Sequence, residues 1–238
     1  ALLCYSSIAQ QYYIRNRAYP NMYLYRNSTH ISSGALIPTS SLYKWTLTGV
    51  SDFIIRGSSI TYEMNINNTS LSYVQCSDVA DGSLAVRWNL IDQDGYKKIQ
   101  SVAYSSYFIY LSSSTPTDTK YVGSTAYPPE NSQWMFELVP IASAGNSLQT
   151  CKSENPITLG GSPTATGVAP FTYSWTATSG APSISNSAVA NPTIIPNIIG
   201  SHIYTVVITD ANFHNHFTKY LFWISHNISN FGIYPHRS

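Results

Sequence analysis

The chain has 238 residues, of which 10% are charged and 13% are aromatic, and its formal net charge is +1. This charge excludes the basic field that binding to nucleic acid or acidic lipid requires, and no apolar run of about 18 residues predicts membrane insertion. The 19 tyrosines and 13 prolines favour an all-β protein whose short strands are broken by turns.

Residues 1–10 (ALLCYSSIAQ) form a short apolar stretch that ends on small residues before a strand-like segment. This pattern is typical of the second half of a secretory signal peptide, with cleavage near Ala9 or Gln10. We therefore expect residues 1–10 to be a signal-peptide remnant and the protein to be secreted. The alternative is an ordinary first strand.

Three tryptophans, Trp45, Trp88 and Trp134, recur in similar frames with a period of roughly 45 residues. Ahead of each lies a pair of segments in which apolar and polar residues alternate, as on strands with one buried face. These pairs are residues 12–16 and 22–25, 53–57 and 60–64, and 96–100 and 107–111. Four short strands per repeat predict a closed pseudo-threefold barrel, because one repeat alone cannot bury its apolar face. Three repeats are too few for a propeller.

This pattern resembles the β-trefoil and, within it, the ricin-type lectin family, whose repeats close on Gln-x-Trp. The resemblance covers about residues 11–141. Here the glutamine two places before each tryptophan is replaced by Tyr43, Val86 and Ser132. We therefore expect the three tryptophans to be core residues and not ligand contacts.

Residues 142–152 are small, polar and aperiodic, which predicts a linker. In residues 153–225, apolar strand-like segments recur about every ten residues between Gly/Pro turns, which indicates a β-sandwich. Three phrases resemble the PKD-type immunoglobulin-like domain of bacterial surface proteins: residues 161–167 (GSPTATG), 169–175 (APFTYSW) and 204–212 (YTVVITDAN). The resemblance implies a spacer or adhesion module.

The last residues, 226–238, resemble the start of the C-terminal sorting domain of type IX secretion substrates in Bacteroidetes. The family usually continues Tyr-Pro-Asn-Pro, whereas His236 and Arg237 follow the tyrosine and proline here. The alternative is a frayed polar terminus.

The cysteines do not form a disulfide framework. Cys4 falls in the predicted signal segment, which leaves Cys76 and Cys151, and the sequence leaves open whether these two pair or stay free.

No pattern of catalytic or metal-binding residues stands out. His214 and His216 lack a third ligand, and Asp92-Gln-Asp94-Gly95 lacks the further acidic positions of a calcium loop and fits a hairpin turn. Neither Gly-x-Ser-x-Gly nor a phosphate-binding Gly-rich loop occurs. We therefore expect no catalysis, no cofactor and no metal within these residues.

The likeness to ricin-type lectins implies where a sugar site would lie. In that family an Asp follows the second strand, an aromatic residue lies about twelve places before the tryptophan, and an Asn lies three before it. Leu42 and Ala85 stand at the Asn place in the first two repeats, which implies that both sites are degenerate.

The third repeat matches best. Asn131 stands three places before its tryptophan and Tyr121 lies near the aromatic place, so Tyr121 is expected to stack on a sugar and Asn131 to bond a hydroxyl. Asp118 is the candidate for the missing acidic anchor, and Tyr127 is a second loop tyrosine. The alternative is that both tyrosines are ordinary loop residues in a tyrosine-rich protein.

The expected function is that of a secreted or cell-surface carbohydrate-binding protein. Its expected partners are glycans or cell-surface polysaccharide, together with other surface proteins. One alternative is a structural or adhesive surface protein that assembles with protein partners. Another is an accessory fragment of a larger secreted glycoside hydrolase.

Overall fold

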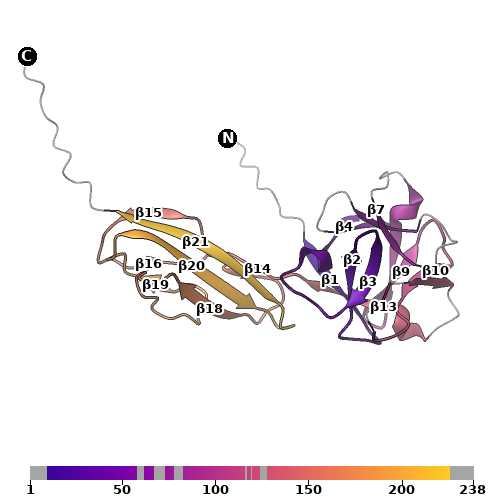
Figure 1. The fold of residues 1–238 in the computed structure, drawn as a ribbon. Helices are drawn as coiled ribbons and strands as arrows, with labels where there is room; N and C mark the ends of the chain where they lie inside the picture. Colours follow the sequence, from indigo (N-terminus) through magenta and orange to yellow (C-terminus); the bar gives the residue numbers. More distant parts are fainter. Residues whose placement is uncertain are drawn as a thin grey trace, which may run out of the picture. The chain divides into compact units, whose positions relative to one another are not determined.

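The computed structural model describes residues 10–57, 62–66, 73–77, 83–115, 117–118, 120–123 and 128–225. The side chains of residues 117–118 and 120–123 fall outside this description. The chain divides into two compact units, unit 1 up to Val139 and unit 2 from Pro140 (Figure 1).

Unit 1 is built on a closed ring of six antiparallel strands, each paired with the next. The pairing of the last strand with the first, through residues such as Ile14 and Phe136, closes the ring. In ring order the strands are β1 (Gln11–Asn16), β4 (Trp45–Gly49), β5 (Phe53–Gly57), β8 (Arg87–Gln93), β9 (Tyr96–Ser101) and β13 (Gln133–Leu138). Closure leaves the ring without an exposed edge.

Each repeat also carries a two-stranded antiparallel hairpin between its two ring strands. The hairpins are β2 (Tyr23–Asn27) with β3 (His30–Gly34), β6 (Glu63–Asn65) with β7 (Gln75–Ser77), and β10 (Tyr107–Tyr110) with β12 (Lys120–Gly123). A short β11 (Thr117–Asp118) pairs with β3. A six-stranded ring with three hairpins is a β-trefoil, so the predicted all-β trefoil is confirmed.

The three repeat tryptophans occupy equivalent places in one core. Trp45, Trp88 and Trp134 are 0% exposed. Each indole N–H donates to a carbonyl of its own repeat's hairpin: that of Leu24 at 3.0 Å, of Met64 at 2.9 Å and of Ile109 at 3.0 Å. Each tryptophan is also preceded by a short 3-10 turn: η1 (Ser41–Tyr43), η2 (Leu84–Val86) and η3 (Pro129–Ser132). The prediction that the tryptophans are core residues is therefore confirmed.

Unit 2 has a four-stranded sheet as its main layer, in the order β15, β21, β20, β18. One face of this sheet packs in a second core together with residues of two small two-stranded sheets. The main strands are β15 (Leu148–Cys151), β21 (Asn215–Ser225), β20 (Gly200–Thr209) and β18 (Thr172–Ala177). The small sheets pair β14 (Ile141–Ala142) with β17 (Ala165–Thr166) and β16 (Ile157–Thr158) with β19 (Thr193–Ile194).

The prediction of a linker at residues 142–152 is wrong. Ala142 belongs to β14, and Leu148–Cys151 form β15, which runs parallel to β21. The segment carries no apolar period because β14 is only two residues long and β15 is an edge strand held by backbone hydrogen bonds. Almost any residue other than proline can form such bonds, so the polar composition gave no sign of the strands.

Cys76 and Cys151 are both free thiols, which answers the question that the sequence left open. Cys76 lies buried in unit 1, where burial raises the pKa of its thiol to about 12, whereas Cys151 is half-buried in unit 2. The predicted signal remnant, apart from Gln10, and the predicted sorting segment lie outside the described residues. Within the described residues, no helix has the length and apolar character needed to cross a membrane.

Candidate functional site

Unit 1 carries a hollow of about 220 Å³ at the junction of its first and third repeats. One wall is the turn between β1 and β2, and the other is the segment that follows β10. Met22 is buried at its base, Ala18 and Tyr19 are half-buried, and the remaining lining residues are exposed. The full lining is Ala18, Tyr19, Pro20, Asn21, Met22 and Ser114.

The turn that forms the first wall begins at Asn16, a buried residue at the end of β1. The backbone N–H of Tyr19 donates to Asn16 Oδ1 at 3.1 Å, and the N–H of Met22 donates to the carbonyl of Tyr19 at 2.9 Å. An Asn side chain that accepts from a backbone N–H a few residues on is a common turn initiator, and Pro20 restricts the next backbone angle. The wall is therefore held by local sequence.

Asn131 joins this turn to the opposite wall. Its side chain is 8% exposed, and its Nδ2 donates to the carbonyl of Leu111 at 2.7 Å. The Nδ2 of Asn16 in turn donates to the carbonyl of Asn131 at 3.0 Å, and the Tyr19 hydroxyl donates to the carbonyl of Ser112 at 3.2 Å. Asn131 thus holds the walls of the hollow in place and is not among the side chains that line it.

The other two repeat junctions lack this pair of amides. In the first repeat, the first strand β1 ends at Asn16. The equivalent strands β5 and β9 of the second and third repeats end at Gly57 and Ser101. Ser101 still accepts from the N–H of Tyr104 at 3.2 Å, but Leu42 and Ala85 stand at the place of Asn131 and carry no amide. The hollow therefore lies at the junction whose sequence differs from the other two.

None of the six described residues that line the hollow carries a charge. The nearest cation in sequence, Arg17, is engaged elsewhere: its guanidinium donates to Gln133, pairs with Asp94 at 3.3 Å and lies 4.8 Å from the ring centroid of Tyr96. The hollow is thus a neutral surface of ring, amide and hydroxyl groups.

The other predicted site residues are only partly described. The backbone of Tyr121 lies on β12 opposite Ile109, and that of Asp118 lies on β11 opposite Ser32. Their side chains, and all of Tyr127, lie outside the described residues. The structure therefore does not test whether the side chains of these three residues lie together at a sugar site.

Sequence reasoning missed Asn16, Tyr19, Asn21 and Ser114. The available signal was the turn sequence from Asn16 to Asn21, Asn-Arg-Ala-Tyr-Pro-Asn. That sequence predicts a tight turn, but it does not show that residues near position 114 lie against it.

No family model matches this chain, and no curated protein matches it. Among solved structures, it is similar to a GlcNAcα1-4Gal-releasing endo-β-galactosidase from Clostridium perfringens, at 20% identity and a TM-score of 0.48, over 54% of this chain and 32% of that one. It is also similar to a lectin from Polyporus squamosus, at 15% identity and a TM-score of 0.45, over 56% and 50% of the two chains.

A third similar structure is the ricin B-like lectin of Macrolepiota procera in complex with lactose, at 16% identity and a TM-score of 0.45. That match covers 54% of this chain and 94% of the lectin. The chain spans about a third of the galactosidase and half of the Polyporus lectin. The closed ring of strands in unit 1, and not these likenesses, identifies its fold.

Proposed function

We propose that unit 1 binds carbohydrate, with a neutral sugar unit seated in the hollow between its first and third repeats. The observation that carries this proposal is the uncharged lining, in which the ring of Tyr19, the amide of Asn21 and the hydroxyl of Ser114 surround one small cavity. A pyranose offers an apolar C–H face to an aromatic ring and hydroxyls to amides and hydroxyls. A shallow site of this size implies weak binding for a single sugar.

The chemistry of the hollow supports binding without catalysis. Hydrolysis of a glycosidic bond needs two placed carboxyl groups, and none of the described residues that line the hollow supplies one. In the described part of the chain, no three His, Cys, Asp or Glu residues gather as a metal site would need. The ring, amide and hydroxyl groups of the described lining are therefore proposed to bind a sugar.

The residues predicted from the third repeat extend this proposal. Asp118 follows Ser114 by a few residues along the chain, and its backbone pairs with β3 of the first repeat. We keep Tyr121, Asp118 and Tyr127 as proposed contacts for a second sugar unit beside the hollow. Asn131 is proposed to position the walls.

The proposal includes a secreted or cell-surface location, with unit 2 serving as a PKD-like spacer or adhesion module. The low share of charged residues and the high content of tyrosine support this part. The layered β-structure of unit 2 is compatible with an immunoglobulin-like sandwich.

A glycan array probed with the full chain, followed by calorimetric titration of the selected glycan, tests the proposal. Asn21→Ala should weaken binding by about two- to tenfold, the worth of one hydrogen bond. The matched control is Ser106→Ala, because Ser106 is exposed at the corresponding position of the turn after β9. It should leave affinity unchanged.

Two results would contradict the proposal. If no glycan binds at millimolar concentration, unit 1 is not a carbohydrate-binding module, and an adhesive role through protein partners takes its place. If a glycan binds and Asn21→Ala has no more effect than Ser106→Ala, the hollow is not the site.

A further inference from the structure

The main sheet of unit 2 carries large exposed apolar side chains on its outer face, in addition to the apolar residues on its core face. Along β21, Tyr220, Phe222 and Ile224 point into the core, while the alternate residues face outward. Phe217 and Trp223 are 52% and 51% exposed on that outer face. An antiparallel sheet with one covered face normally turns polar residues outward, so this outer face calls for a ligand or a partner.

The outward residues of β21 are flanked by apolar and small polar side chains on the neighbouring strand. Leu221 lies opposite Ile203 on β20, and both are exposed. Trp223 lies opposite Ser201 on the same strand. The indole therefore stands at one end of the face, beside a hydroxyl and next to an aliphatic pair.

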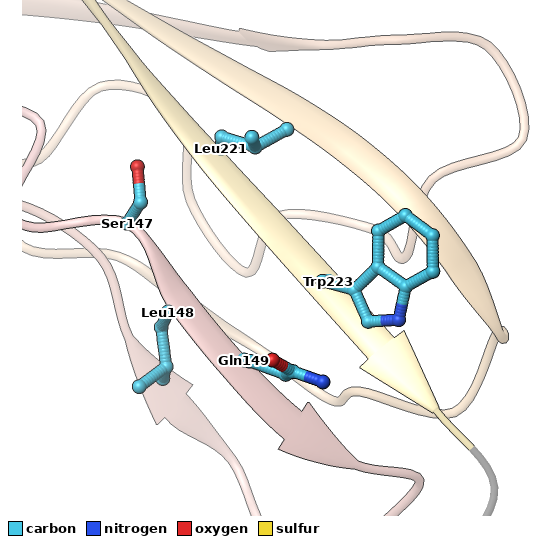
Figure 2. A pocket seen from close by; sticks show the side chains of 5 residues that line it. All are labelled: Ser147, Leu148, Gln149, Leu221 and Trp223. Atoms are coloured by element: carbon cyan, nitrogen blue, oxygen red, sulfur yellow. The ribbon is translucent and has the colours of Figure 1, made fainter.

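A shallow hollow of about 210 Å³ adjoins the indole on its other side, where β15 forms the sheet edge. Figure 2 shows the five side chains that line it, contributed by β21 and by the chain at and just before β15. Gln149 is in register with Trp223 across the parallel pair, so the two side chains share one face of the sheet. The lining is Ser147, Leu148, Gln149, Leu221 and Trp223.

We propose that this hollow is a second carbohydrate site, which takes one ring of a neutral, β-linked polysaccharide against the indole of Trp223. The site lies wholly in unit 2 and goes beyond the proposed function of unit 1. The indole and Leu221 offer an apolar platform for the C–H face of a pyranose. The amide of Gln149 and the hydroxyls of Ser147 and Ser201 offer hydrogen bonds to its ring substituents.

The charge of this face decides the kind of ligand. None of the five described lining residues is charged, so the hollow offers nothing to pair with the acid groups of an anionic polysaccharide. The charged residue in the outward row of β21 is Lys219, two positions beyond Leu221 along the strand and away from Trp223. A β-linked chain of glucose or N-acetylglucosamine is neutral, and its rings carry their substituents at the edge, which leaves flat faces for an indole.

A peptide or second protein is the less fitting occupant. The outward positions of the central strand β20 include Ser201, Thr205 and Thr209, which interrupt the apolar side chains. A stable protein interface is usually built around a continuous apolar centre. An indole set among hydroxyl and amide groups fits a sugar ring better.

Trp223 also provides an optical signal for this site. All five tryptophans lie within the described residues, and Trp45, Trp88, Trp134 and Trp175 are at most 3% exposed. Trp223 is therefore the indole that a water-soluble quencher such as acrylamide reaches. A ligand seated on it should shield it, whether or not unit 1 also holds a ligand.

Acrylamide quenching of tryptophan fluorescence in the full chain, with and without cellotetraose or chitotetraose, tests whether a ligand shields Trp223. Calorimetric titration measures the affinity of the variants, because those that lack Trp223 also lack the indole that the quencher reaches. We expect one of these tetrasaccharides to lower the quenching slope by about twofold and Trp223→Ala to weaken its binding to the unit 2 site by about tenfold, the scale of one aromatic contact. Trp223→Phe should retain most of that affinity. Phe217→Ala is the matched control, since Phe217 is equally exposed on the same strand but does not line the hollow.

Asn21→Ala, which alters the hollow of unit 1, should leave the shielding of Trp223 unchanged. The proposals for the two sites are therefore tested independently. The proposal is overturned if neither tetrasaccharide shields Trp223. It is also overturned if Phe217→Ala weakens binding as much as Trp223→Ala, because the contact would then be spread over the whole face, as in protein docking.

Discussion

At the scale of single residues, unit 1 relies on polar side chains that are buried but bonded. The three core indoles each donate their N–H to a hairpin carbonyl, so a large ring enters the core without leaving a donor unpaired. Asn16 and Asn131 do the same at the junction of the first and third repeats, where their amides bond to backbone. Buried amides therefore position the hollow that we propose as a sugar site.

Asn131→Ala tests this positioning role. The substitution leaves the carbonyl of Leu111 without the side-chain donor, and we expect unfolding in urea to show a loss of about 1–3 kcal/mol. Sugar affinity should fall in the same variant because the walls of the hollow move. Ser132→Ala, in the same 3-10 turn, is the control: it removes only a solvent-exposed hydrogen bond from the Ser132 hydroxyl to the carbonyl of Pro129 and should change stability by about 0.5 kcal/mol or less. Lower affinity with unchanged stability would instead show that Asn131 contacts the ligand directly.

At the scale of elements, β15 completes one edge of the main sheet of unit 2. It pairs in parallel with the last described strand, so residues early in unit 2 complete a sheet with residues near position 222. Lys152 continues this edge, since its N–H donates to the carbonyl of Ser225 at 2.9 Å. The next N–H, that of Ser153, donates to the carbonyl of Pro196 at 3.0 Å.

Limited trypsin digestion distinguishes an edge strand from a linker. Cleavage requires the chain to open locally over several residues. We therefore expect the bond after Lys152 to resist trypsin in the native protein and to be cut once urea unfolds it, as mass spectrometry of the fragments would show. Rapid native cleavage after Lys152, which has an exposed side chain, would mean that the segment is a linker after all.

At the scale of the whole molecule, the two units have separate hydrophobic cores. The core of unit 1 gathers around Trp45, Trp88 and Trp134, and that of unit 2 contains Trp175 and Tyr204. Residues belonging to one core do not appear in the other. Each unit therefore has the apolar burial of an independent cooperative domain.

Calorimetry of paired variants tests this independence. Trp88→Ala should cost about 3–5 kcal/mol and lower one thermal transition by roughly 10 °C or more. Trp175→Ala removes an indole whose N–H donates to the carbonyl of Val189, and it should lower the temperature of the other transition. A single transition that both substitutions shift equally would show that the two units unfold as one.

The repeat architecture of unit 1 could be predicted because it is local. Trp45, Trp88 and Trp134 each follow strands whose apolar residues alternate, and the need to bury three such faces leads to a closed ring. For the candidate site, Asn131 could be singled out only through the resemblance to ricin-type lectins, which places an Asn three residues before the tryptophan. The direction of its amide could not be predicted, since this depends on the carbonyl of Leu111.

The sequence by itself thus determined the all-β class, the threefold repeat and the core role of its tryptophans, because side-chain periodicity records which face of a strand is buried. Only the tertiary structure decided that the turn after Asn16 meets the segment near Ser114 and that β15 completes the sheet beside Trp223. Both depend on contacts between distant segments. Where such contacts are made by backbone hydrogen bonds, almost any side chain permits them. The pairing therefore cannot be predicted from the sequence.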